Sequence, residues 1–161
     1  MEKESDLEDL KKDYKKVQSK YNLPSFVELN KDFNVEKIAE IQTDFLIREV
    51  RKFMADRFSN YLRFVEALLN PANAPMFVFS IVKSISNEEK NKLTEIYKKL
   101  AQIEVEIIEL DLEFIEDKEA EFVKNSYKTW QEIKSELLEI IKIIKKNWNN
   151  KSEVNGKGYF G

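Results

Sequence analysis

The sequence has no cysteine and no histidine among its 161 residues. Without cysteine the chain forms no disulfide and has no thiolate for catalysis, for a zinc ribbon or for an iron–sulfur cluster. Without histidine it has no imidazole to serve a catalytic triad or to bind zinc or iron. These two absences exclude the commonest catalytic and metal-binding arrangements, and we expect the protein to use no cofactor.

Glycine is almost absent as well, and its three positions, Gly156, Gly158 and Gly161, all lie near the C-terminus. Glycine lets the backbone adopt positive φ angles and approach a phosphate closely. The glycine-free stretch 1–155 therefore excludes a P-loop, a dinucleotide-binding turn and a kinase-type phosphate loop. It also disfavours a fold rich in tight β-hairpins, whose turns depend on glycine.

The chain carries 27 Lys and Arg against 30 Asp and Glu, a formal net charge of −3, and 42% of its residues are hydrophobic. This length and hydrophobic content suit one domain, which we place at residues 1–148. The apolar run 72–82 is too short to cross a bilayer, and the charged N-terminus lacks the apolar segment of a secretion signal. We therefore expect a cytoplasmic protein with no membrane partner.

Apolar residues recur every three or four positions through most of the chain, which is the spacing of amphipathic helices. The spacing predicts an N-terminal helix over residues 4–20. A short turn of helix follows Pro24, with Ser25 as its N-cap. A long helix is predicted over residues 35–69, with Asn34 as its N-cap.

The second half of the chain continues this pattern. The apolar segment 75–85 has no polar face, so we expect a short helix that is buried. Two further long helices are predicted over residues 86–114 and 118–148. Residues 103–115 also alternate apolar and acidic side chains, as a half-buried strand does, but the helical register that starts at Leu93 continues through them, which favours a helix.

Three long helices, an N-terminal helix and a short buried helix predict an all-α fold, an elongated antiparallel bundle. Residues 87–117 carry four lysines and ten acidic residues, whereas residues 118–148 carry seven lysines and five acidic residues. Opposite charges on consecutive antiparallel helices favour their pairing. The same heptad faces could also pair between two copies of the chain, so a homo-oligomer stays an open alternative. Residues 149–161 are expected to form a flexible tail.

Three charged residues fall within the predicted apolar faces. Arg57 lies on the face of the 35–69 helix, and Glu104 and Asp111 lie on the face of the 86–114 helix. A buried charge needs a partner, because leaving it unpaired is costly. We therefore predict a buried structural ion pair between Arg57 and Glu104 or Asp111.

Carboxylates at helical spacing also suggest a divalent-metal site, as in an all-α hydrolase. Besides Glu104 and Asp111, the 86–114 helix and the residues after it present an outer acidic stripe, formed by Glu106, Glu109, Glu113 and Glu116. The Glu-Glu-x-x-Glu motif of all-helical nucleotide pyrophosphatases is absent, because Lys92 follows Glu88-Glu89 where that motif has a carboxylate. A solvated helix face is the preferred interpretation, and the metal-dependent hydrolase is kept as an alternative.

All four arginines lie on the predicted 35–69 helix, and Arg48, Arg51, Lys52 and Arg63 share one side of it. Arginine is well suited to binding phosphate and to bidentate pairing with carboxylates. A nucleic-acid or ribosome-binding face is therefore an alternative function. The acidic isoelectric point and the lack of a recognised nucleic-acid motif argue against it.

The C-terminal residues Lys157-Gly-Tyr-Phe-Gly161 place Tyr159 and Phe160 at the end of a polar segment. Aromatic side chains on a tether are typical of short motifs that anchor in a partner's pocket. The stretch Ile140–Lys146 with Trp148 has the composition of a membrane-surface helix, but its register continues the bundle core. We therefore predict a non-enzymatic interaction or scaffold protein whose partner is another protein, contacted through Tyr159 and Phe160.

Overall fold

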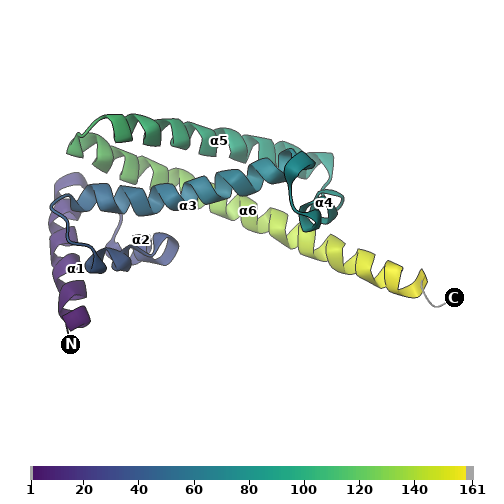
Figure 1. Cartoon of the computed structure of the whole chain (residues 1–161), viewed down its shortest axis with the longest axis horizontal. Coiled ribbons are helices and arrows are strands. Elements are labelled where there is room, and N and C mark those ends of the chain that lie inside the picture. The colour runs from purple at the N-terminus through teal and green to yellow at the C-terminus, as the bar shows by residue number, and fades with distance from the viewer. Residues whose placement is uncertain (1, 159–161) are drawn as a thin grey trace. The chain divides into compact units, whose positions relative to one another are not determined.

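The computed structural model describes residues 2–158, and the side chains of residues 3–150. The fold of this part of the chain is all-α, as the apolar spacing predicts, and it contains no strand. Residues 103–112 are helical, which confirms the helix rather than the strand interpretation of the alternating acidic segment. Figure 1 shows the order of the helices along the chain.

The elements are α1 (Glu2–Tyr21), α2 (Phe26–Phe33), the 3-10 helix η1 (Val35–Glu40), α3 (Leu46–Leu69), the 3-10 helix η2 (Pro71–Asn73), α4 (Met76–Val82), α5 (Asn87–Leu112) and α6 (Glu116–Gly158). The residues form two compact units, which we describe separately. The first unit comprises Met1–Asn60 and Gln102–Thr129, and the second comprises Tyr61–Ala101 and Trp130–Gly161.

The first unit contains α1, α2, η1 and parts of α3, α5 and α6. Ser25 caps α2 as predicted: its side chain accepts a hydrogen bond from the Glu28 backbone, and the Glu28 carboxylate accepts one from the Ser25 backbone. Tyr14 of α1 is buried and donates its hydroxyl proton to the Pro24 carbonyl at 2.6 Å. This bond holds α1 against the segment that leads into α2.

Aromatic rings fill the centre of the same unit. The ring of Phe58 lies 5.5 Å from that of Phe33 and 6.3 Å from that of Phe122, both edge to face. Edge-to-face packing is a favoured arrangement of aromatic rings. The three rings join α2, α3 and α6 in one core.

The predicted long helix over residues 35–69 is wrong in its first part. Asn34 adopts a left-handed conformation (φ 57°) and ends α2, and residues 35–40 form the 3-10 helix η1. Ile41 is extended, and α3 begins only at Leu46. Asparagine tolerates the left-handed region better than most residues, and it ends one helix here instead of starting a long one.

The second unit is held by the apolar stripes predicted for α5 and α6. The buried members of these stripes in this unit are Leu93, Ile96 and Leu100 on α5 and Trp130, Ile133, Leu137, Ile140 and Ile144 on α6. The Tyr61 ring of α3 lies 5.0 Å from that of Trp130. On the outside, Lys99 of α5 pairs with Glu132 and Glu136 of α6 at 3.5 and 3.4 Å.

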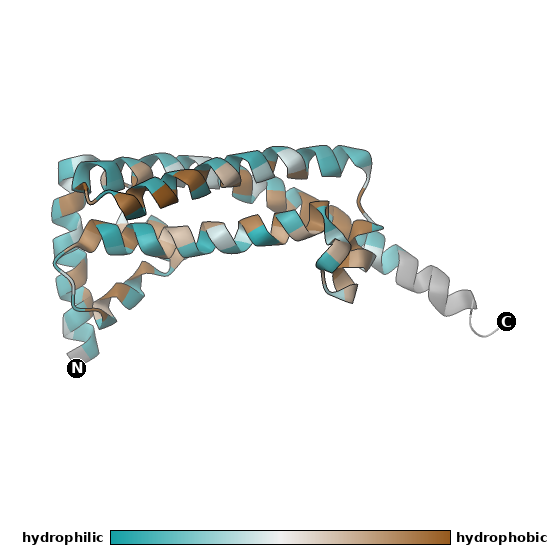
Figure 2. Cartoon of the chain, turned by 45° about the horizontal axis from the view of Figure 1, so that its top comes forward, coloured by the Kyte–Doolittle hydropathy of each residue, from teal (hydrophilic) through white to brown (hydrophobic). Residues whose placement is uncertain are grey.

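The short helix α4 is present, but the expectation that it is buried is wrong. Met76 is 88% exposed, Phe77 58% and Phe79 42%, whereas Val78 is buried. Figure 2 shows α4 as a mostly hydrophobic ribbon. A helix without a polar face is buried only where neighbouring elements cover all its sides, and the elements among the described residues leave Met76, Phe77 and Phe79 uncovered.

Helix α6 continues past Trp148, its expected end, to Gly158. The segment 149–158, expected to be a flexible tail, is therefore helical in its backbone. Tyr159 and Phe160, the predicted partner-binding residues, lie outside the described residues.

Candidate functional site

Two arginines of α3 hold the turn between α5 and α6. Arg51 is 1% exposed, and its Nε donates to Oε2 of Glu119 at 2.7 Å while an Nη donates to Asp111 at 2.8 Å. Glu119 is 2% exposed. Burial alone would lower the pKa of Arg51, but the hydrogen bonds with Glu119 and Asp111 outweigh it, so its pKa is raised and its charge is secure.

Arg48 lies three residues before Arg51 on α3 and contacts the other side of the connection between α5 and α6. Its guanidinium donates to Oε1 of Glu119 at 2.9 Å and to the carbonyls of Leu110 and Glu113 at 3.3 and 3.4 Å. The same group stacks on the Phe114 ring, 4.2 Å from its centroid. Arg48 therefore satisfies backbone acceptors at the C-terminal end of α5 and fixes an aromatic side chain.

A buried ion pair is present, but its arginine is Arg51 and not the predicted Arg57. Arg57 is exposed, Glu104 accepts a hydrogen bond from Ser59 at 2.8 Å, and Asp111 pairs with Arg51. Arg51 is buried because it continues a core stripe of α3 that steps four, three and four positions. The other members of that stripe are Ile47, Met54 and Phe58.

The same contacts engage two cations of the alternative nucleic-acid face. Arg51 and Arg48 are turned to Glu119, so neither guanidinium is available to phosphate. Lys52 pairs with Glu49 at 3.0 Å, and Arg63 is exposed. The four basic residues share a side of α3 by their spacing, but Arg51 is buried and the Arg48 side chain is only 14% exposed.

A divalent-metal site was kept only as an alternative, and among the described residues no group of three or more His, Cys, Asp or Glu is placed to hold an ion. Within the acidic stripe, Lys118 pairs with Glu113 and lies 3.6 Å from Glu109. Glu116 accepts a hydrogen bond from the Tyr21 hydroxyl and lies 3.5 Å from Lys20. Cations of the chain itself thus neutralise most of these carboxylates.

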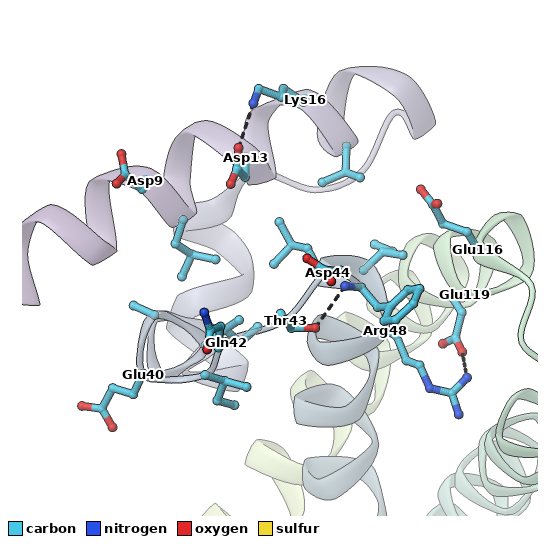
Figure 3. A pocket seen from close by; sticks show the side chains of 18 of the residues that line it. Asp9, Asp13, Lys16, Glu40, Gln42, Thr43, Asp44, Arg48, Glu116 and Glu119 are labelled. Carbon is cyan, nitrogen blue, oxygen red and sulfur yellow. Dashed lines mark hydrogen bonds and ion pairs between the residues drawn. The ribbon is translucent and has the colours of Figure 1, made fainter.

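Beside the arginine-held turn, the first unit contains a groove of about 980 Å³. Its walls are α1, the residues 38–48 that lead from η1 into α3, and the residues 114–119 that start α6. Figure 3 shows Asp9 and Asp13 of α1 on one side and Glu116 and Glu119 on the other, with the Arg48 guanidinium next to Glu119. We call this site the α1–α3 groove.

Large apolar side chains at the α1–α3 groove are exposed to solvent. Ile41 is 42% exposed, Phe45 55%, Phe114 62% and Ile115 44%. The rings of Phe45 and Phe114 meet edge to face with centroids 4.9 Å apart. Buried Leu10, Ile38 and Ile47 form apolar walls below them.

The rim of the groove is acidic. Seven acidic and two basic side chains line it, so the formal charge of the lining is negative. Lysines just outside the lining pair with Asp9, Glu40 and Glu116. Asp13 pairs with Lys16 at 2.8 Å, and Glu119 is bound by Arg48. Asp6 and Asp44 are exposed at the edge.

Comparisons with protein families, with curated proteins and with solved structures found no match to this chain.

The sequence pattern did not predict the groove, because residues 41–45 fell inside a predicted long helix. Thr43 and Asp44 carried the available signal, since both residue types favour positions just before a helix. In the structure Thr43 accepts a hydrogen bond from the Phe45 backbone at 3.0 Å, and α3 starts directly after it.

Proposed function

We propose that this protein is a non-enzymatic interaction module, and that the α1–α3 groove binds an apolar segment of a partner protein that also carries basic residues. The observation that carries the proposal is the gathering of Ile41, Phe45, Phe114 and Ile115, all more than two-fifths exposed, at one hollow. Exposed apolar side chains grouped in this way commonly mark a binding surface.

The size of the groove suits side chains of a partner. Its volume of about 980 Å³ lies at the upper end of the range in which proteins bind small ligands, and it is large enough for several anchoring side chains. Aromatic and aliphatic anchors that enter such pockets supply most of the binding energy of many interfaces.

The charge of the rim decides which segment fits. With seven acidic and two basic side chains around the groove, a basic segment gains from long-range attraction and an acidic one is repelled. The arginine-held turn adds preorganisation: Arg48 fixes the Phe114 ring through stacking, so that ring loses little freedom when a partner binds.

Selection from a random peptide library displayed on phage, with the full chain as bait, tests the proposal. We expect enriched peptides to combine two or more large apolar residues with Lys or Arg. Phe45→Glu and Ile115→Glu should each weaken binding of the enriched peptides by at least about tenfold, since each places a charge at the apolar contact.

Leu112→Glu is the matched control, because Leu112 is 84% exposed and does not line the groove. It should bind the selected peptides as the unchanged chain does. Enrichment of acidic peptides, or equal binding by the Phe45→Glu and Leu112→Glu variants, would contradict a basic, apolar occupant of the groove.

The C-terminal Tyr159 and Phe160 remain a proposed second binding element, supported by the sequence alone. Replacing both with alanine should leave thermal unfolding unchanged and weaken the capture of native partners from lysate. Unchanged capture would remove this element from the proposal and leave the groove untouched, since the peptide selection does not involve it.

A further inference from the structure

Helix α4 exposes large apolar side chains in the second unit. Met76 is 88% exposed, and Phe77 and Phe79 are 58% and 42% exposed. These residues directly follow Pro75, which occupies the N-cap of α4. Exposure of this degree on consecutive large apolar residues is unusual, because such residues are normally among the most buried.

The last turns of α6 adjoin α4. Ile81 of α4 lines a shallow hollow of about 360 Å³ together with Ile144, Lys145 and Trp148 of α6. Trp148 is 42% exposed at this hollow. The two elements are joined by a hydrogen bond from the Asn147 side chain to the Ser84 carbonyl at 2.7 Å.

The segments that form this surface carry charge of one sign only. Residues 67–87 and 140–150 contain no Asp or Glu, in a chain that has 30 of them. They contain four lysines, Lys83, Lys142, Lys145 and Lys146. Local charge is therefore positive although the whole chain is acidic. We call the exposed apolar residues of α4, with Trp148, Lys142, Lys145 and Lys146, the α4 surface.

We infer that the α4 surface docks on an anionic phospholipid bilayer, with Met76 and Phe77 entering the interfacial region and the lysines facing the headgroups. No described helix of the chain is long and apolar enough to cross a bilayer, so the attachment is peripheral. The inference is independent of the proposed function, because the α1–α3 groove lies in the other unit.

The residue types favour lipid over a protein partner. Tryptophan and phenylalanine partition into the interface between lipid and water, and lysines near an anionic leaflet add electrostatic attraction. A side chain as exposed as Met76 inserts into a fluid layer without needing a shaped pocket, whereas a protein partner needs a complementary surface. The register of α6 suggested that this end of the chain packs into the bundle, but Trp148 and α4 are exposed instead.

Flotation of the purified full chain with extruded vesicles tests the inference. One set of vesicles contains phosphatidylcholine alone, and the other contains about 30% phosphatidylserine, to represent an anionic leaflet. We expect co-flotation with the anionic vesicles at low salt and a loss of binding as salt rises. Acrylamide quenching of tryptophan fluorescence should fall on binding, because Trp148 is partly exposed and Trp130 is already buried.

Charge substitutions separate the apolar and the electrostatic contributions to vesicle binding. Phe77→Glu should abolish co-flotation, and the double variant Lys142→Glu/Lys145→Glu should reduce binding to anionic vesicles by about tenfold or more. Leu112→Glu is the matched control, because Leu112 is an apolar residue of the other unit that is 84% exposed, and this variant should bind as the unchanged chain does. Circular dichroism melts verify that each variant is folded.

Two outcomes would overturn the inference. One is the absence of co-flotation with anionic vesicles at low salt. The other is self-association, measured by light scattering, that Phe77→Glu abolishes while vesicles remain unbound, which would make the α4 surface a contact between copies of the chain.

Discussion

Nε of Arg51 lies 2.7 Å from Oε2 of Glu119, and the two side chains are only 2% and 3% exposed. The contact joins α3 to the first turn of α6 across 68 residues of sequence. A buried ion pair of this kind is sensitive to the loss of one partner, because the remaining charge stays in a poorly solvated place.

Glu119→Gln tests this sensitivity. The amide keeps the shape of the carboxylate but leaves Arg51 with Asp111, which is more than half exposed, as its only carboxylate partner among the described residues. We expect the free energy of unfolding to fall by about 3 kcal/mol, measured by urea denaturation. The exposed pair of Glu49 and Lys52 supplies the control: Lys52→Ala should change stability by less than about 0.5 kcal/mol. Equal effects of the two substitutions would contradict a special role for the buried pair.

Arg48→Ala should loosen the turn between α5 and α6. The substitution leaves the carbonyls of Leu110 and Glu113 without this donor and removes the cation from the Phe114 ring. We expect a loss of about 2 kcal/mol and faster amide hydrogen exchange in residues 113–119. Exchange in α1 serves as the internal reference and should change less. Arg48→Lys should not restore protection, since one ammonium group cannot reproduce the planar fork of the guanidinium.

Asn34→Val should destabilise the connection between α2 and η1. Asn34 has a φ of 57°, a conformation that is strained for a β-branched residue. The expected loss is about 1–2 kcal/mol, measured by thermal or urea unfolding. Asn34→Gly is the matched control and should be close to neutral, because glycine adopts this conformation freely. A neutral valine variant would contradict the left-handed conformation.

Glu106→Gln should stabilise the protein at neutral pH. Burial raises the pKa of Glu106, and the neighbouring carboxylates Glu109 and Glu121 raise it further. A carboxyl group whose pKa is raised in the folded state stabilises that state when it is protonated. This contribution to stability is lost as the pH rises from the ordinary pKa of the group through its raised pKa. The variant should therefore melt at a higher temperature than the unchanged chain at pH 7. The difference should disappear near pH 3 (about 1 unit below the usual Glu value). A difference that stays the same at both pH values would exclude titration of Glu106 as its cause.

The long helices were predictable because one pattern determines both helix and burial. On α5 the same spacing that predicts the helix also selects its core residues, Leu93, Ile96, Leu100, Ile103, Ile107 and Leu110, and all of these are buried. Phe114, the next position in that spacing, lies beyond the end of α5 and is 62% exposed. On α6, Phe122 through Ile144 follow the same rule, and even Ser126 is buried and satisfies its hydroxyl on the Phe122 carbonyl at 2.6 Å.

Burial of a charged residue was harder to predict because it depends on where the core face of α3 is centred. Centring the face on Phe53 and Tyr61 selects Arg57, whereas the structure centres it on Ile47, Met54 and Phe58 and buries Arg51. The two arginines are six positions apart, which places them about 120° from each other around the helix axis. Only the position of the neighbouring helices distinguishes these registers.

The exposure of α4 and the α1–α3 groove could not be read from local sequence. An apolar segment such as 76–82 predicts burial only if another element covers it, and local spacing does not contain that information. The groove depends on an irregular segment, residues 41–45, which separates η1 from α3. Both surfaces arise from how elements distant in sequence meet.

The uninterrupted stripes of α5 and α6 restrict how this protein can change in length during evolution. One inserted residue within either helix would rotate every later side chain by about 100° and turn core residues toward water. Insertions and deletions should therefore accumulate at residues 41–45, 70–75 and 83–86, which lie between helices. The turn at residues 113–115 is an exception among the connections, because Arg48 and Arg51 bind both of its ends and fix its length.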